Sequence, residues 1–444
     1  MVPGRSISLV TYSDEKLLMT TTPISSRAII LLLAPLFFLA STFPYIQLLP
    51  SSSYTQPYAL ILGLILFSFS LGAIIKLRLS DQISIIGLAF VGVALFITTG
   101  SHESPQEYRY LLAFLSPLLL VPVYLTAIDS LPKFTIKILQ ISIAIWIIVS
   151  VVQSTVDPLF ATFLLGHWGS NAENIISSGR GVLGLAPEPT HNAFHILLLG
   201  AALSQLDTSR TSRALTFGCI ITATLLAASS SAILALLFGS TIWLLRRHPL
   251  TGLIVIIIGL FSLSYMPLLL KIIWGESSRL TTLATAFLES PIELLTIDYS
   301  VNIRLGGLIA TLSESINSGF IPHGLSHETW LQARTEMLNE NKWLFDLSLV
   351  GPPSGLGLLI FQGGIFVFPF LFMCIRRMLS THPPTMFGQI LVTTVPFIFL
   401  SQFYISSPLF SMVYACTLYK YRTVHPDQYK AQVPTPKSTI PYLP

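Results

Sequence analysis

Long apolar runs alternate along the chain with short polar connections, and most of the runs are close to the length of a helix that crosses a bilayer. Each run is therefore predicted to be a transmembrane helix, which gives about 12 helices. The predicted spans are 28–49, 58–75, 83–99, 110–128, 134–152, 192–206, 214–228, 231–245, 250–270, 356–375, 386–403 and 408–419. The fold class is an all-α polytopic membrane protein.

Lysine and arginine occur in pairs on alternate connections, as expected for loops that stay in the cytoplasm. If the N-terminus is cytoplasmic, the inside connections carry Lys76 and Arg78, Lys133 and Lys137, Arg210 and Arg213, Arg246 and Arg247, and Arg376 and Arg377. This pattern places both termini inside. It predicts a cytoplasmic tail over 1–27, one transmembrane domain over 28–422, and a flexible cytoplasmic tail over 423–444.

Two of the predicted outside loops are large, 153–190 and 271–354. They contain cations that depart from the positive-inside pattern: Arg180, Lys271, Arg279, Arg304, Arg334 and Lys342. An anionic ligand is one reason to keep cations there. Apolar residues recur at helical spacing over 279–295 and 304–316, which predicts short amphipathic helices at the outer membrane–water boundary.

Composition supports the membrane class. The chain of 444 residues is 52% hydrophobic and only 10% charged, whereas soluble domains carry roughly 25% charged residues. The net charge of +4 comes mainly from the predicted cytoplasmic side, so it does not indicate a nucleic-acid partner. The cysteines Cys219, Cys374 and Cys416 lie in apolar runs, which argues for thiols that face lipid or the core rather than for disulfides or a metal site.

The most constrained polar stretch that adjoins an apolar run is 178–191. Glu188 lies between two prolines, and a residue before proline is pushed to extended conformations. Pro189 suits the first position of a helix. Glu188 is therefore expected at the N-terminal mouth of the next helix, where the dipole favours a carboxylate and free N–H groups can bind an anion. The alternative is that Glu188 only caps this helix and pairs with Arg180.

Further candidates lie on the same helix and in the second loop. Glu188, His191 and His195 have spacing that could offer a metal face, but no zinc helix motif is present, and a histidine packed in the bundle is favoured. Arg304 opens a predicted amphipathic helix, where its guanidinium would suit a diphosphate or would simply reach toward the interface. Arg279, near Glu276, has the pattern of a solvated pair.

A turn bracketed by proline and glycine follows at 321–328 and contains His323 and His327. Two histidines with a glutamate in such a turn form a candidate general-base site. The alternative interpretation is an ordinary surface turn.

Several of these features together resemble the superfamily of O-antigen polymerases (Wzy-type) and O-antigen ligases, which are polysaccharide-assembling membrane proteins. The resemblance rests on Arg180, Gly184 and the sequence Glu188-Pro189-Thr190 ahead of a helix, similar to an Arg, Gly, Glu-Pro-Ser element of that family. It rests also on the serine break at 229–231, and on a large loop with Arg304 that is followed by the segments 318–324 and 355–357.

The resemblance implies metal-independent glycosyl transfer, with no cofactor, at the periplasmic face of the bacterial inner membrane. The donor and the acceptor would be undecaprenyl-diphosphate-linked glycans, and a chain-length regulator could be a partner besides the membrane lipids. Arg180 and Arg304 would bind the diphosphate. Glu188, and after it His323 and His327, would be the base, with His191 and Arg279 as secondary candidates.

The ligases' periplasmic His-Ser-His-Asn type of signature is absent from this chain, in which the most similar segment is 323–328. This difference favours a polymerase over a ligase that transfers glycan to lipid A-core.

A flippase or another transporter is the alternative from a different class. It predicts a polar stripe through several helices and internal pseudo-symmetry, and neither is found in the sequence.

Overall fold

The computed structural model describes residues 24–48, 55–99, 104–177, 181–262, 265–274, 279–290, 294–381, 383–401 and 405–424. Within these ranges the chain forms helices and turns, without a β-strand. Nearly all of both predicted tails lies outside the described residues. The all-helical class predicted from the sequence is confirmed.

The helices follow the apolar runs closely in the first part of the chain. They are α1 (Ile24–Thr42), α2 (Tyr58–Ile75), α3 (Leu79–Thr99), α4 (Pro105–Ser130), α5 (Pro132–Thr155), α6 (Ala172–Ser177), α7 (Pro189–Leu206), α8 (Arg210–Ile221), α9 (Ser230–Arg247) and α10 (Pro249–Ser262). The remaining helices are α11 (Met266–Trp274), α12 (Arg279–Glu289), α13 (Leu294–Ile297), α14 (Tyr299–Val301), α15 (Gly307–Asn317), α16 (His327–Glu340), α17 (Gly355–Gly363), α18 (Phe368–Ser380), α19 (Met386–Ser401) and α20 (Pro408–Val424).

In the described part of the chain, 5 helical segments are long and apolar enough to cross a membrane: α2, α3, α4, α5 and the segment Gly355–Ser380, which joins α17 and α18. Other apolar helices are shorter. The 14 residues of α10, for example, cover about 21 Å at 1.5 Å per residue, against a hydrocarbon core of about 30 Å. The chain is thus a helical protein with several membrane-crossing candidates, and the full set of about 12 spans stays a prediction.

Two local expectations were wrong. The run 250–270 falls on two helices, α10 and α11, instead of one. Arg304 does not open a helix, because α14, a π-helical turn over Asn302–Gly306 and α15 follow one another without a break. That helix begins at Tyr299, where the Asp298 side chain accepts a hydrogen bond from Val301 N at 2.9 Å. Arg304 therefore lies past the N–H groups of the first turn.

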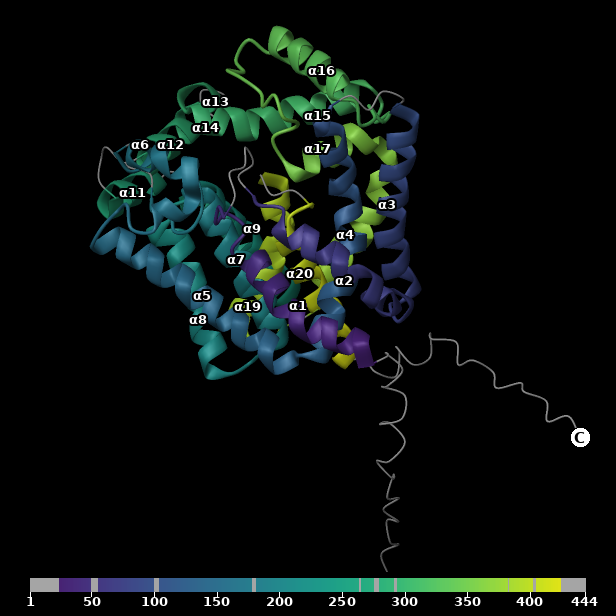
Figure 1. Cartoon of the computed structure of the whole chain (residues 1–444). Helices are drawn as coiled ribbons and strands as arrows, with labels where there is room; N and C mark the ends of the chain where they lie inside the picture. Colours follow the sequence, from purple (N-terminus) through teal and green to yellow (C-terminus); the bar gives the residue numbers. More distant parts are fainter. Residues whose placement is uncertain are drawn as a thin grey trace, which may run out of the picture.

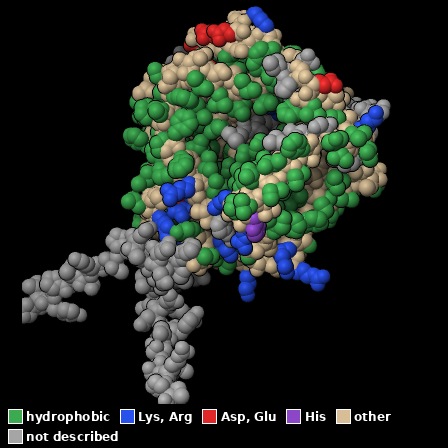
Figure 2. All heavy atoms as spheres, turned by 180° about the vertical axis from the view of Figure 1, so that it is seen from behind, with side chains coloured by type: hydrophobic (Ala, Val, Ile, Leu, Met, Phe, Trp, Pro, Cys, Tyr) green, Lys and Arg blue, Asp and Glu red, His purple; other side chains and the backbone are tan. Residues whose placement is uncertain are grey.

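The predicted amphipathic segments at 279–295 and 304–316 do contain helices, α12 and α15. A further helix, α16, was not predicted. Figure 1 shows α12 to α16 gathered at one end of the helix bundle, away from the end where α20 stops. Figure 2 shows that, on the face it draws, most Lys and Arg side chains collect at the end opposite the acidic ones.

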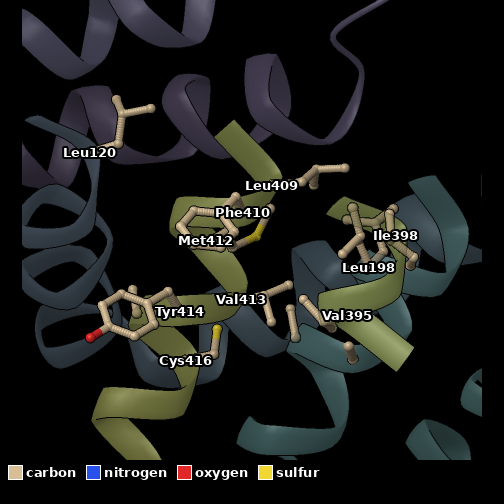
Figure 3. Packing of buried hydrophobic residues seen from close by; sticks show 14 of the residues in the cluster. Leu120, Leu198, Val395, Ile398, Leu409, Phe410, Met412, Val413, Tyr414 and Cys416 are labelled. Carbon is tan, nitrogen blue, oxygen red and sulfur yellow. The ribbon is translucent and has the colours of Figure 1, made fainter. Parts of the chain in front are cut away.

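The core lies where α20 packs against α4 and α7, and where α7 in turn packs against α19. Leu198 of α7 lies beside Val395 and Ile398 of α19, and Val413 of α20 points towards them (Figure 3). All of these side chains are buried. The three cysteines are free and buried, so their thiols face the core rather than lipid. Because α7 is enclosed on several sides, its first residues are held in a fixed position.

Candidate functional site

Glu188 occupies the N-terminal mouth of α7, as predicted. Its backbone is extended (φ −144°, ψ 150°), and Pro189 is the first helical residue. The Glu188 side chain makes no capping hydrogen bond to its own helix. The capping part of the alternative is therefore wrong, whereas the pairing of Glu188 with Arg180 falls outside the described residues.

The Glu188 carboxylate instead forms an ion pair with the guanidinium of Arg304, which lies 116 positions further along the chain. Nη1 of Arg304 also donates a hydrogen bond to the Thr190 hydroxyl at 2.8 Å. The side chains of Arg304 and Glu188 are 15% and 24% exposed. The pair is thus ordered by its surroundings but still accessible to a ligand.

Ser229 adds a second hydroxyl to this cluster. Its side chain donates to the Thr190 hydroxyl at 3.3 Å and accepts a hydrogen bond from Ala232 N at the start of α9. Two helix N-termini and the π-helical turn of the second loop therefore meet at Thr190. We call Glu188, Thr190, Ser229 and Arg304 the Glu–Arg cluster.

The loop that precedes Glu188 is anchored to the same region. Val182 N donates to the carbonyl of Leu226 at 3.0 Å, and a Cβ at Gly181 would lie 2.2 Å from the carbonyl oxygen of Ala227. Only glycine fits this approach of two backbones. Arg180, the first diphosphate-binding candidate, lies outside the described residues, although Gly181, which directly follows it, is part of this contact.

Gln153 of α5 clamps the middle of the loop. Its Oε1 accepts from Gly184 N at 2.6 Å and its Nε2 donates to Gly184 O at 2.9 Å, in a buried environment. Gly184 has φ +60°, and a Cβ there would lie 2.5 Å from Oδ1 of Asn192. Both backbone and packing require glycine at this position.

Gly184→Ala should lower the free energy of unfolding by roughly 2–4 kcal/mol, from left-handed strain and overpacking together. The matched control is Gly259→Ala on α10, where no atom lies within 4 Å of a new Cβ, and this change should be close to neutral. Thermal unfolding of the purified proteins in detergent measures both. Equal stability of the two variants would show that the loop does not require glycine at position 184.

A buried aromatic layer is built around His191 and His195, which follow Glu188 on α7. His195 stacks on Trp146 with ring centroids 4.3 Å apart, and its Nε2 lies 2.8 Å from the carbonyl oxygen of Thr42. The centroid of the Tyr45 ring lies 6.0 Å from that of the His191 ring and 5.5 Å from that of the His195 ring. His195 is thus a packed histidine, as the sequence favoured, and His191 joins this layer to the turn that carries Glu188.

The aromatic layer does not form a metal centre in the described residues, where no group of three His, Cys, Asp or Glu side chains is close enough to hold an ion.

His323 lies in a different environment. Its ring stacks on Phe361 at 4.2 Å, its Nδ1 lies 3.1 Å from the Phe361 carbonyl oxygen, and its Nε2 lies 3.5 Å from the Glu314 carboxylate. Glu314 is ten residues beyond Arg304 on one continuous helix, or about 15 Å along the axis. The structure therefore sets His323 apart from the Glu–Arg cluster.

His327 is the first residue of α16, which Ser326 caps. Its backbone N–H donates to Glu107 at 3.3 Å, and its Nδ1 lies 3.4 Å from the hydroxyl of Tyr110, both on α4. The 321–328 turn thus docks α16 onto the start of α4.

Arg279 is the first residue of α12, and its side chain lies outside the described residues.

Sequence reasoning overlooked the partners that hold these candidates. Thr190 and Ser229 were within the segments of interest, but nothing in the sequence showed that their hydroxyls meet. Glu314 and Glu107 gave no signal beyond being acidic residues on or near apolar helices. Contacts between different elements are set by tertiary packing, which local periodicity does not report.

The Glu–Arg cluster combines a guanidinium, a carboxylate and two hydroxyls at the N-termini of α7 and α9. Such a set can bind an anionic oxygen through the guanidinium and the helix ends, and can accept a proton through the carboxylate. Comparisons with known proteins add no family to this description: no protein-family model, no curated protein and no solved structure matches the chain.

Proposed function

We propose that the chain is a polysaccharide polymerase of the bacterial inner membrane. It would join undecaprenyl-diphosphate-linked oligosaccharide repeat units by glycosyl transfer at the periplasmic face, with both termini in the cytoplasm. The single observation that supports this proposal most is the Glu188–Arg304 ion pair. It joins the two large predicted outside loops at a helix mouth, and the family resemblance implies that residues of both loops act on one substrate.

The chemistry of the proposed donor explains why a partly buried arginine is useful. When the bond between the sugar C1 and the diphosphate oxygen breaks, negative charge develops on a leaving group that is tethered at the membrane surface. Guanidinium groups bind phosphate oxygens through two parallel hydrogen bonds. Arg304, with Arg180 from the first loop, would neutralise that charge as it forms.

Glu188 supplies the other half of the proposed reaction. Its carboxylate would take the proton from the acceptor hydroxyl as the new bond between C1 and the acceptor oxygen forms. Before the diphosphate binds, Arg304 and Glu188 neutralise each other. When Arg304 turns to the diphosphate, the carboxylate loses its cation and becomes a stronger base. His323 and His327 then serve the fold of the second loop rather than the proton transfer.

The lipid-linked glycan profile of a deletion strain tests the function. Loss of a polymerase should leave surface glycans of one repeat unit, and complementation should restore long chains. Polymer that accumulates on the lipid carrier would instead identify a ligase. Repeat units trapped on the cytoplasmic leaflet would identify a flippase.

A further inference from the structure

A cavity of about 140 Å³ lies at the far end of α9 from the Glu–Arg cluster. It is lined by Trp243, Arg246, Arg247, Thr381, Gln389 and Thr393. Since α9 has 18 residues and Ser229 caps its start, the cavity and the cluster are separated by about 25 Å along the helix. The cavity is therefore a separate site.

The walls of this cavity are held by hydrogen bonds between elements. Trp243 Nε1 donates to Gln389 Oε1 at 2.7 Å, and Gln389 Nε2 donates to the Pro383 carbonyl at 2.7 Å. Arg246 Nη1 donates to the Leu379 carbonyl at the end of α18, at 2.6 Å. The cavity is thus preformed between α9, α18 and α19, so a ligand would not have to order its walls.

The two arginines give the cavity a positive charge. In the part of the chain that the structure describes, neither Arg246 nor Arg247 takes part in an ion pair with a carboxylate. Both lie in the last turn of α9, where the negative end of the helix dipole tolerates cations. Two guanidinium groups beside this cavity, neither paired with a described carboxylate, favour an anionic, phosphate-bearing ligand.

The surroundings of the cavity are apolar and exposed. Leu245 precedes the arginines, and α10 presents Leu250, Leu253 and Ile254 to the outside. Tryptophan is enriched at membrane–water interfaces, and Trp243 forms part of the wall. A ligand that fits both features has a phosphate at its head and hydrocarbon chains that stay along these apolar residues.

We propose that this cavity binds the phosphate-bearing headgroup of an anionic phospholipid from the leaflet next to it. Basic pockets between transmembrane helices bind such headgroups through their phosphate. The volume admits a headgroup phosphate but not a whole lipid, so the acyl chains would lie against α9 and α10. The site would fix the end of α9 to α18 and α19 while Ser229, at its other end, stays in the Glu–Arg cluster.

Native mass spectrometry of the full chain in detergent tests the site, with phosphatidylglycerol, phosphatidylcholine and inorganic phosphate as separate probes. Arg246→Ala with Arg247→Ala removes both cations. The matched control is Arg210→Ala with Arg213→Ala, which removes two exposed cations from the start of α8, away from the cavity. The affinity for phosphatidylglycerol should fall about fivefold for each arginine that is removed, or roughly 25-fold for the pair. It should stay unchanged in the control.

Several results would overturn the proposal. Equal loss in the control pair would mean attraction by net charge rather than by this cavity. Equal binding of phosphatidylcholine would remove the requirement for an anionic lipid, and inorganic phosphate that competes on its own at the same concentration would point to a free anion. If the double variant does not fold, Arg247→Glu replaces it in the same binding experiment. Arg247 takes part in no hydrogen bond or ion pair that the structure describes.

Discussion

Arg304→Ala is expected to abolish long-chain polymer in a complemented deletion strain while the protein remains inserted at normal levels. Removing one preorganised group that stabilises developing negative charge typically costs 100- to 1000-fold in rate, on the order of 3–4 kcal/mol. Arg304 would carry at least that much, because it also holds Glu188 and Thr190 in place. Arg304→Lys should recover only part of the activity, since an ammonium cannot form two parallel hydrogen bonds to a phosphate.

Arg334→Ala is the matched control for this result. Arg334 lies in the same predicted loop and also pairs with a carboxylate, that of Asp346 at 2.5 Å, but it belongs to α16 rather than to the Glu–Arg cluster. Polymer length should be kept in this variant. Equal loss of polymer in both variants would mean that any broken ion pair in the loop is sufficient, and the role given to Arg304 would then be withdrawn.

Asp81→Ala should lower the free energy of unfolding by about 3–5 kcal/mol, because it leaves the charge of Arg377 buried without its partner. The carboxylate and guanidinium lie 2.7 Å apart, and their side chains are only 6% and 10% exposed. The Arg377 guanidinium also lies 4.3 Å from the ring centroid of Tyr421, so the pair ties α3 and α18 to the end of α20. Thermal unfolding in detergent is the measurement.

The contrast for this prediction is Arg422→Ala. Arg422 pairs with Asp129 between α20 and α4, but the two side chains are 27% and 35% exposed. Water screens such a pair, and its loss should cost less than about 1 kcal/mol. If the two variants lose the same stability, burial is not what makes the Asp81–Arg377 pair important.

The sequence predicted the positions of the helices well where the signal is local. The apolar run 58–75 coincides with α2, and the two prolines around Glu188 placed this residue at the start of α7. Both predictions rest on rules that involve neighbouring residues only: apolar length, and the backbone restriction before proline. Arg304 and Glu188 were both among the candidates, from two separate loops.

The sequence could not show that Arg304 and Glu188 form a pair. That contact depends on how the second loop folds over the bundle, and the start of the helix that carries Arg304 was placed five residues too late. His323 shows the same limit. Its turn was recognised, but its partner Glu314 and its stacking on Phe361 are tertiary contacts that no spacing rule reports.

The central claim is that Glu188 and Arg304 act together on a diphosphate-linked glycan. Reconstitution of the purified chain in liposomes with undecaprenyl-diphosphate-linked repeat units, in the presence of a metal chelator, tests it most directly. The wild-type chain should produce a ladder of longer lipid-linked glycans, and Glu188→Gln should produce none while still binding the substrate. A ladder of equal length from Glu188→Gln, or no ladder from the wild-type chain, would contradict the account.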